Sequence, residues 1–261
     1  MIRQSPSIFN DIVGPAMVGP SSSHTCAPSR IGFLARQLLP GTLKKAIISF
    51  AKDGAYTMMY KGQRSDMGFV NGLLGNRPED PRLRDAFREA EKIGVEIQFK
   101  IEDFPAVVPN ISHITLENTK GERVVVHSDS TGGGTVKLLK IDEFDVEIVG
   151  DCYELIVWAD RSETHAQDLC SEIQSLSALD EGHSISEKSG KCLINIKYRE
   201  PLETELLDKI KSIPDVTKVI LMEPILTVLS NRHCSLPFSS AEEMLEYAHS
   251  SGRGLWELAV E

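Results

Sequence analysis

Five small or polar residues stand in a row near the N-terminus, in the segment GPAMVGPSSSHTCAPSRIGFLARQLL at residues 14–39. They are Ser21, Ser22, Ser23, His24 and Thr25, and an apolar pattern with helical spacing begins a few residues later. Hydroxyl groups and unpaired backbone N–H groups at the start of a helix can bind a carboxylate or a phosphate. A histidine among them can donate a hydrogen bond or take a proton near pH 7. The pattern predicts either an anion-binding site or, more simply, a capped helix start, because one serine suffices as an N-cap.

The elements that must position these residues follow from hydrophobic periodicity. The spacing of Ile31, Leu34, Ala35 and Leu38 predicts one buried helix face. A second helix is expected over residues 80–94, where it begins at Asp80 or Pro81 and ends at Gly94. Its predicted buried stripe consists of Leu83, Ala86, Phe87, Ala90 and Ile93. Apolar alternation predicts strands over residues 44–51, 95–101, 113–118 and 122–129, and a glycine-rich loop at 130–134 leads into a further strand.

The pattern of elements restarts near residue 151. Strand, helix, two strands, helix and strand follow one another over residues 151–222, which is the ferredoxin-like βαββαβ order. A serine-capped helix is expected over residues 239–252, and the chain stops inside another helix that starts at residue 254. We therefore expect an α+β protein with a first domain at residues 1–150, a second at 151–222 and a helical tail at 223–261. The ending inside a helix predicts a longer natural polypeptide.

Composition excludes several function classes. The 261 residues carry a net charge of −10, which argues against nucleic acid and anionic membrane as main partners. No apolar run approaches the roughly 20 residues needed to span a bilayer, and the first residues are too polar for a signal peptide. The five cysteines are scattered without a CxxC pair, so we expect reduced thiols in a cytoplasmic protein and no metal site in this chain. A buried, inert Cys26 is the favoured interpretation of the thiol beside the motif.

The motif GPAMVGPSSSHT, with SRIGFLAR after it, closely resembles the signature of iron–sulfur-dependent L-serine dehydratases at the start of their β chain. Residues 58–75 are similar to the family's Gly-His-Gly-Thr-Asp segment, residues 108–116 to its His-Pro-Asn segment, and residues 130–138 to its Ser-Ile-Gly-Gly-Gly loop. The resemblance implies a β-type α/β sandwich of the allosteric substrate-binding kind. It also implies an ACT domain at residues 151–222 and, more weakly, the start of the α catalytic domain at 238–261.

The resemblance implies the elimination of water from L-serine, which gives pyruvate and ammonia. A [4Fe–4S] cluster held by the α portion would act on the leaving hydroxyl, and this chain would be inactive without that portion. The implied catalytic residues are Ser23, His24 and Thr25. The implied substrate-binding residues are Ser21, Ser22, Gln63, Arg64, Asp66, Asn110, Ser130, Gly132 and Gly133. The implied partners are an α catalytic domain or subunit, a small hydroxy-acid or amino-acid substrate and a second copy of the chain.

Two departures from the family pattern bear on the substrate. Gln63 and Val108 stand where the family segments have histidines, and neither side chain can act as a base. Arg64 adds a cation suited to a second carboxylate. The substrate is therefore either L-serine, with Arg64 on a drifted loop, or a hydroxy dicarboxylate such as that of the related 2-(hydroxymethyl)glutarate dehydratase.

A different class of function stays open. The first domain also resembles the effector-binding domain of some phosphoglycerate dehydrogenases, so the chain is alternatively a small-molecule-binding regulatory module. The loss of two histidines favours this alternative, and the α-like tail favours the dehydratase. In the second domain, residues 160–164 lack the glycine that usually meets an amino-acid effector in ACT domains. We expect pairing of two such domains more than effector binding.

Overall fold

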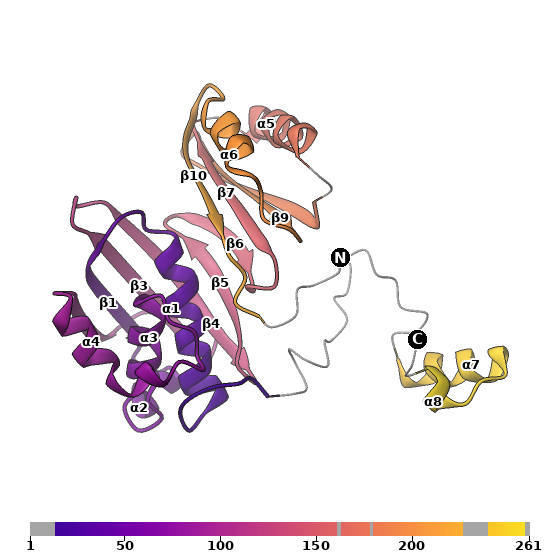
Figure 1. Ribbon diagram of the computed structural model, residues 1–261, viewed down its shortest axis with the longest axis horizontal. Helices are drawn as coiled ribbons and strands as arrows, with labels where there is room; N and C mark the ends of the chain where they lie inside the picture. Colours follow the sequence, from indigo (N-terminus) through magenta and orange to yellow (C-terminus); the bar gives the residue numbers. More distant parts are fainter. Residues whose placement is uncertain (1–13, 161–162, 178–179, 227–239, 259–261) are drawn as a thin grey trace.

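The computed structural model describes residues 14–160, 163–177, 180–226 and 240–258, whose elements form two β-sheets and the helices around them (Figure 1). The first part contains η2 (Ser22–Cys26), α1 (Ala27–Gln37), β1 (Leu43–Ala51), α2 (Ala55–Met59), α3 (Ser65–Leu73), η3 (Pro81–Asp85), α4 (Ala86–Lys92), β2 (Glu96–Glu102), β3 (Ile111–Asn118), β4 (Arg123–Gly132), β5 (Thr135–Ile141) and β6 (Phe144–Ile148). The second part contains β7 (Tyr153–Ala159), α5 (Glu163–Leu176), β8 (Gly182–Lys188), β9 (Lys191–Tyr198), α6 (Thr204–Lys211), β10 (Val216–Met222), α7 (Ala241–Ser251) and α8 (Leu255–Leu258).

The first sheet has six strands in the order β2-β1-β3-β4-β5-β6. Strands β1 and β2 pair in parallel, and every other neighbouring pair is antiparallel. Helices α1 to α4 lie on one face of this sheet, where α1 contacts β4 and β5 (Figure 1). The predicted helix face is confirmed, because Ile31, Leu34, Ala35 and Leu38 are fully buried in α1 and the residue that follows it.

Helices α1 and α3 pack with their backbones in contact. A β-carbon on Gly32 would lie 2.5 Å from the carbonyl oxygen of Phe69, and one on Gly72 would lie 2.5 Å from the amide nitrogen of Phe33. Real β-carbons do not approach backbone atoms this closely, so glycine is required on both helices. This close packing fixes the start of α3, and the loop before it, against the polar motif at the start of α1.

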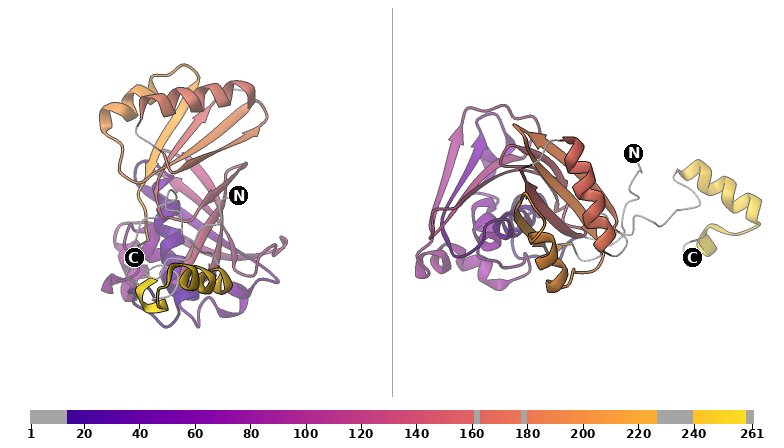
Figure 2. Two further views of the ribbon diagram at one scale, coloured as in Figure 1. Left: turned by 90° about the vertical axis from the view of Figure 1, so that its right-hand side faces the viewer. Right: turned by 90° about the horizontal axis from the view of Figure 1, so that it is seen from above.

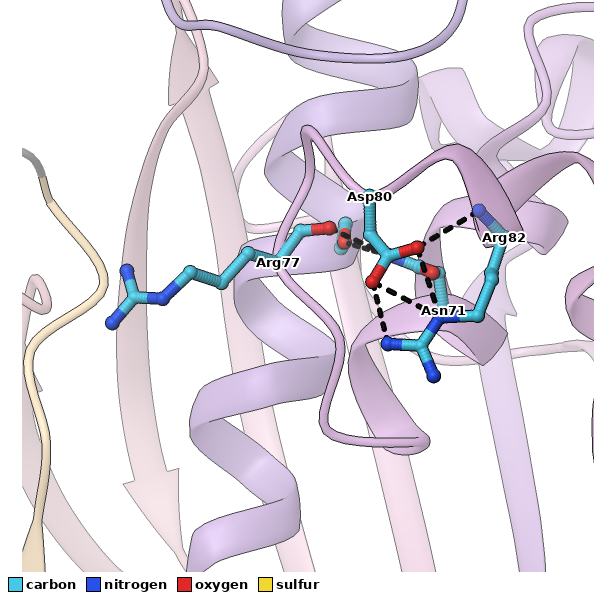
Figure 3. A network of polar contacts seen from close by, with 5 residues as sticks. Asn71, Arg77, Asp80 and Arg82 are labelled. Carbon is cyan, nitrogen blue, oxygen red and sulfur yellow. Dashed lines mark hydrogen bonds and ion pairs between the residues drawn. The ribbon is translucent and has the colours of Figure 1, made fainter.

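A polar network joins these two helices to the segment after α3 (Figure 3). The Asn71 amide on α3 donates hydrogen bonds to the Ser29 hydroxyl on α1 at 2.9 Å and to the Arg77 carbonyl at 3.0 Å. Asp80 then caps η3, where it accepts the backbone N–H of Arg82 at 2.9 Å and pairs with the Arg82 guanidinium at 2.6 Å. The predicted start at Asp80 and Pro81 is therefore confirmed, and the turn that follows is anchored to α1 and α3.

The second sheet has four antiparallel strands in the order β10-β7-β9-β8, with α5 and α6 on one face. The element order from β7 to β10 is the βαββαβ order predicted from the sequence. The expected mixed α+β class is confirmed. The ACT identity and the domain boundaries stay predictions at this point.

The second sheet packs against α1 through the face that α5 does not cover (Figure 2). Ile156, Leu193 and Met222 on that face belong to the same buried cluster as the α1 side chains. The ammonium group of Lys218 also donates to the Leu38 carbonyl at 3.1 Å. The hydrophobic core thus continues across the predicted boundary between residues 150 and 151.

A buried polar group adds to this junction. The Glu154 carboxylate is 1% exposed, and it accepts hydrogen bonds from Lys197 at 2.6 Å and from Asn195 at 2.8 Å. The Lys197 ammonium group also donates to the Glu147 carbonyl on β6 at 2.9 Å. Because buried charges need partners, this network fixes β6 against the second sheet.

The helix predicted over residues 80–94 is wrong in part. It is divided into η3 and α4, and Phe87 is 39% and Ile93 66% exposed, although both were expected in the buried stripe. The tighter winding of η3 rotates the residues after it relative to a continuous α-helix. Gly94 does adopt the expected left-handed conformation, with φ 75°. The short elements α2 and β6 were not predicted, and no helix among the described residues has the length and apolarity to cross a membrane.

Two histidines form a ring stack on neighbouring strands of the first sheet. The ring centroids of His113 and His127 lie 3.6 Å apart, and Phe104 stacks on His113 at 3.8 Å. Burial and, to a smaller extent, the nearby His127 lower the pKa of His113 to about 4, against the opposing effect of Glu102. Burial likewise lowers the pKa of His127, with a further contribution from Lys140. Both rings are therefore neutral at pH 7 and pack against each other across the two strands.

We expect the stack to destabilise the protein in acid. The pKa of His113 is 6.5 in the unfolded chain and about 4 in the fold, so the unfolded chain binds protons more readily between these values. The free energy of unfolding should therefore fall as the pH drops through this window. The two rings are partly exposed to solvent, which weakens the effect, so we expect a loss on the order of 1 kcal/mol. Urea unfolding at pH 7 and pH 5 measures it, and the same loss in a His113→Phe variant would contradict this origin.

Candidate active site

The polar motif forms a π-helical turn that runs directly into α1. Ser21 is its N-cap, because the Ser21 hydroxyl accepts the backbone N–H of His24 at 3.1 Å. The Ser21 carbonyl accepts the N–H groups of Thr25 and Cys26 at 2.8 and 3.2 Å. The capping role predicted for one residue of the motif is thus met by Ser21. The N–H groups of Ser22 and Ser23 come first in the helix and lack intrahelical acceptors by position.

His24 is held by its neighbour in the motif. The Ser23 hydroxyl lies 2.9 Å from His24 Nδ1 and 3.5 Å from the Ser21 hydroxyl. Burial lowers the pKa of His24, so the imidazole is neutral near pH 7. Its Nε2 atom is buried and has no hydrogen-bond partner among the described residues. A neutral imidazole with one nitrogen engaged by a serine can donate or accept a hydrogen bond at the other nitrogen.

Thr25 connects the motif to the loop before α3. Its side chain is fully buried, and its hydroxyl donates to the Gln63 carbonyl at 2.7 Å. The structure therefore brings the segment with Gln63 and Arg64 next to the motif. Asp66 lies inside the first turn of α3, where it accepts the N–H of Met67 at 2.8 Å and burial raises its pKa. Asp66 does not cap α3, because the helix already begins at Ser65.

The hairpin between β4 and β5 lies against the other side of the motif. The Ser130 hydroxyl donates to the Ser23 carbonyl at 2.9 Å, across 107 positions of sequence. The Asn110 side chain in turn donates to the Ser130 carbonyl at 3.1 Å. Gly132 and Gly133 form the turn with φ of 112° and 62°, which glycine adopts most easily. Three of the segments singled out in the sequence thus meet at the serine-histidine turn.

Two further residues belong to this cluster and were missed in the sequence. Tyr56 on α2 is fully buried, and its ring meets the His24 ring edge-on at 5.6 Å. Burial raises the pKa of Tyr56, and Asp129 adds to the shift; the nearby Ser130 hydroxyl opposes it without meeting hydrogen-bond geometry with Tyr56. Asp129 on β4 is 7% exposed, and burial raises its pKa against the effect of backbone N–H groups of Ser130 and Asn110. No pattern marked either residue. Tyr56 lies in α2, which was not predicted, and Asp129 stands at the end of the strand predicted over residues 122–129.

The cluster contains several buried polar atoms without a partner in the described structure. They are His24 Nε2, the Tyr56 hydroxyl, Asn110 Oδ1 and Asp129 Oδ1, and Ser65 Oγ is a further one at the start of α3. Buried polar atoms normally have hydrogen-bond partners, and each one left unpaired costs free energy. Their concentration around His24 indicates a site for a polar ligand that supplies both donors and acceptors.

The described part of the chain contains no group of three His, Cys, Asp or Glu side chains placed to hold a metal ion. Cys26, Cys152, Cys170 and Cys192 are buried, and Cys234 lies outside the described residues. Burial raises the pKa of Cys26 to about 11, with Arg30 opposing and Glu79 adding to the shift. The expected burial of Cys26 is confirmed, since its side chain is 0% exposed.

Comparison with curated proteins finds two relatives. The chain is 32% identical over 217 residues to a probable L-serine dehydratase beta chain of Bacillus subtilis (strain 168), an alignment that covers 82% of this chain and 96% of the relative. It is 30% identical over 142 residues to the L-serine dehydratase beta chain of Peptoniphilus asaccharolyticus, which covers 54% of this chain and 63% of that relative. No protein-family model matches the sequence.

Proposed function

The chain belongs to the L-serine dehydratase beta chain family, and we propose on that premise that it binds the substrate carboxylate and closes the active site of an alpha chain. The names of both relatives describe subunits of a lyase. A beta chain requires an alpha chain, so we assign the elimination to the complex of the two. In this proposal the isolated beta chain has no activity.

The observation that carries the proposal is the group of unpartnered polar atoms around His24. A hydroxy amino acid offers carboxylate oxygens and hydroxyl and ammonium hydrogens, which can pair with such a mixed set. We place the substrate carboxylate at the Ser22 hydroxyl and the first two N–H groups of the helix, where the dipole favours an anion. Asn110 and the Ser130 hairpin, with Gly132 and Gly133, then bound the substrate on its other side.

Elimination of water from L-serine removes a proton from the α-carbon and the hydroxyl group from the β-carbon. His24 is the group in this cluster whose neutral imidazole can hold or move a proton near pH 7. The Ser23 hydroxyl at Nδ1 fixes the orientation of the ring and leaves Nε2 for the substrate. Tyr56, edge-on to the ring, limits its rotation and excludes water from that side.

The [4Fe–4S] cluster belongs to the alpha chain in this proposal. When bound there it supplies a Lewis acid for the leaving hydroxyl. The buried cysteines described in this chain are not grouped to hold it. This chain contributes binding, orientation and exclusion of water.

We propose that residues 151–222 form an ACT domain, on the basis of the βαββαβ order and the strand order β10-β7-β9-β8. Pairing of two such domains would give the expected homodimer. The junction at residues 160–164, where effector binding was judged unfavourable, includes Arg161 and Ser162, which lie outside the described residues. Helices α7 and α8 fall in the part of the chain that resembles the start of an alpha domain, residues 238–261.

A hydroxy dicarboxylate is the second candidate substrate. It is favoured by Arg64, an exposed cation beside the motif, and by Gln63 and Val108 at the positions of two family histidines. A regulatory module without catalysis is the remaining alternative, and the same measurement separates all three.

The test is an anaerobic assay of the chain reconstituted with its alpha chain, on L-serine and on 2-(hydroxymethyl)glutarate. We expect pyruvate from L-serine in amounts that depend on the beta chain. Turnover of the dicarboxylate without turnover of L-serine would identify the dicarboxylate, and not L-serine, as the substrate. Saturable binding of either compound, with turnover of neither, would show a regulatory module.

A further inference from the structure

A cavity of about 530 Å³ lies beside the serine-histidine turn. Three segments line it: Val18 and Pro20 before the motif, Arg64 and Met67 at the start of α3, and Leu83 and Arg84 in η3. Its volume is in the range of small-molecule sites. The lining is mostly apolar and includes two exposed arginines, which suits a short aliphatic molecule that carries an anionic group.

Arg64 stands in a conformation that arginine seldom adopts. Its φ and ψ are 60° and 31°, in the left-handed region that favours glycine. The corresponding position of the family segment Gly-His-Gly-Thr-Asp is a glycine. An arginine kept at such a position costs stability that glycine would not, so its side chain is expected to have a use. Among the described residues, the one side-chain hydrogen bond of the Arg64 guanidinium group is to the Met67 sulfur, at 3.3 Å.

Arg84 is the second cation of the cavity. Its neighbours Arg82 and Arg88 pair with Asp80 and Asp85, whereas Arg84 has no carboxylate partner among the described residues. The capped turn that carries Arg84 is anchored by the Asp80 and Asn71 contacts (Figure 3). Two arginines for which the described residues form no ion pair within 4 Å thus belong to the lining of one cavity, and each guanidinium group can bind a carboxylate through two parallel hydrogen bonds.

We propose that Arg64 and Arg84 form a subsite for the second carboxylate of a small dicarboxylate whose first carboxylate binds at the serine-histidine turn. Pro20 precedes Ser21 directly, and Arg64 follows Gln63, whose carbonyl accepts the Thr25 hydroxyl. The two anion sites are therefore adjacent, with the apolar side chains of Val18, Met67 and Leu83 available to the carbon chain. The proposal rests on the proposed function for the first carboxylate, and it names a dicarboxylate as the ligand class.

The experiment is calorimetric titration of the 261-residue chain with glutarate and, as a monocarboxylate of similar length, butyrate. We expect glutarate to bind at least tenfold more tightly than butyrate. Arg84→Gln and Arg64→Gly should each remove that advantage. Arg88→Gln removes a nearby positive charge that does not line the cavity, and it should change glutarate affinity less than twofold. Arg64→Gly should also raise Tm, because glycine relieves the left-handed backbone.

The outcomes separate the subsite from the proposed function. Equal affinities for glutarate and butyrate, or no binding of either, would overturn the subsite, as would undiminished glutarate binding by Arg84→Gln. An equal loss in Arg88→Gln would show nonspecific charge attraction and would overturn it too. If glutarate binding depends on Arg84 but is unchanged in Ser22→Ala, the subsite stands while carboxylate binding at the serine-histidine turn fails.

Discussion

Replacement of His24 by glutamine is expected to lower kcat/KM of the reconstituted enzyme by about 100-fold or more, within the range of general acid–base contributions. Glutamine keeps a hydrogen-bonding side chain of similar size, but it cannot carry a proton. Burial lowers the pKa of His24, so the wild-type rate should fall on the acid side as the ring becomes protonated below its usual value of 6.5. That limb of the pH–rate profile should be absent from the variant.

The matched control is His183→Gln. His183 is an exposed histidine on β8. The His183→Gln variant should keep the wild-type kcat/KM and the fall in rate on the acid side of the pH–rate profile. Circular dichroism of the His24 variant should match the wild type, and its Tm should fall only slightly, because the substitution removes the Nδ1 contact with Ser23 and the ring contact with Tyr56 but no partner of Nε2 among the described residues. Near-wild-type turnover of His24→Gln would remove His24 from the proton chemistry.

Replacement of Gly72 by alanine should separate α1 from α3. The added β-carbon would lie 2.5 Å from the Phe33 amide nitrogen and closer still to the Ser29 carbonyl oxygen, and neither backbone atom can move without shifting α1. Overpacking costs about 1–3 kcal/mol and more where backbone is displaced, against about 1 kcal/mol gained in helix propensity. Because backbone atoms would have to move, we take the upper end of that cost and expect a net loss of about 2 kcal/mol. Urea unfolding measures it, and activity should be lost because α1 carries the motif.

Gly62→Ala is the control for this prediction. Gly62 has no positive φ, and the nearest atom to an added β-carbon there is the Met59 carbonyl oxygen at 3.9 Å. Alanine at this position should leave the free energy of unfolding unchanged or raise it by a few tenths of a kcal/mol. A Gly72→Ala variant as stable as Gly62→Ala would show that the two helices are not held in backbone contact.

Much of the fold was predictable because its elements carry strong local patterns. The apolar spacing of α1, the alternation in β3 and β4, and the βαββαβ order of the second half all appear in the structure. The prediction for residues 80–94 was wrong in part because apolar spacing does not distinguish a 3-10 turn from an α-helix. This error placed Phe87 and Ile93 in the buried stripe, although both are exposed. The short elements α2 and β6 have too few residues for periodicity to register.

The candidate site was predictable only where a motif marked it. The motif located Ser21, Ser23 and His24, and their hydrogen bonds could not be read from residue order. The contact of Ser130 with Ser23 depends on how β4 pairs and where α1 crosses the sheet. Tyr56 and Asp129 reach the cluster through the same tertiary packing. The left-handed backbone of Arg64 is likewise a property of its loop.

The central claim is that this chain supplies one half of an active site whose other half is an alpha chain. The most direct measurement is pyruvate formation from L-serine under anaerobic conditions by the alpha chain alone, by this chain alone, and by a titration of one with the other. We predict no turnover by either chain alone and activity that saturates at a fixed ratio of the two. Full activity of the alpha chain without this chain, unchanged when it is added, would contradict the account.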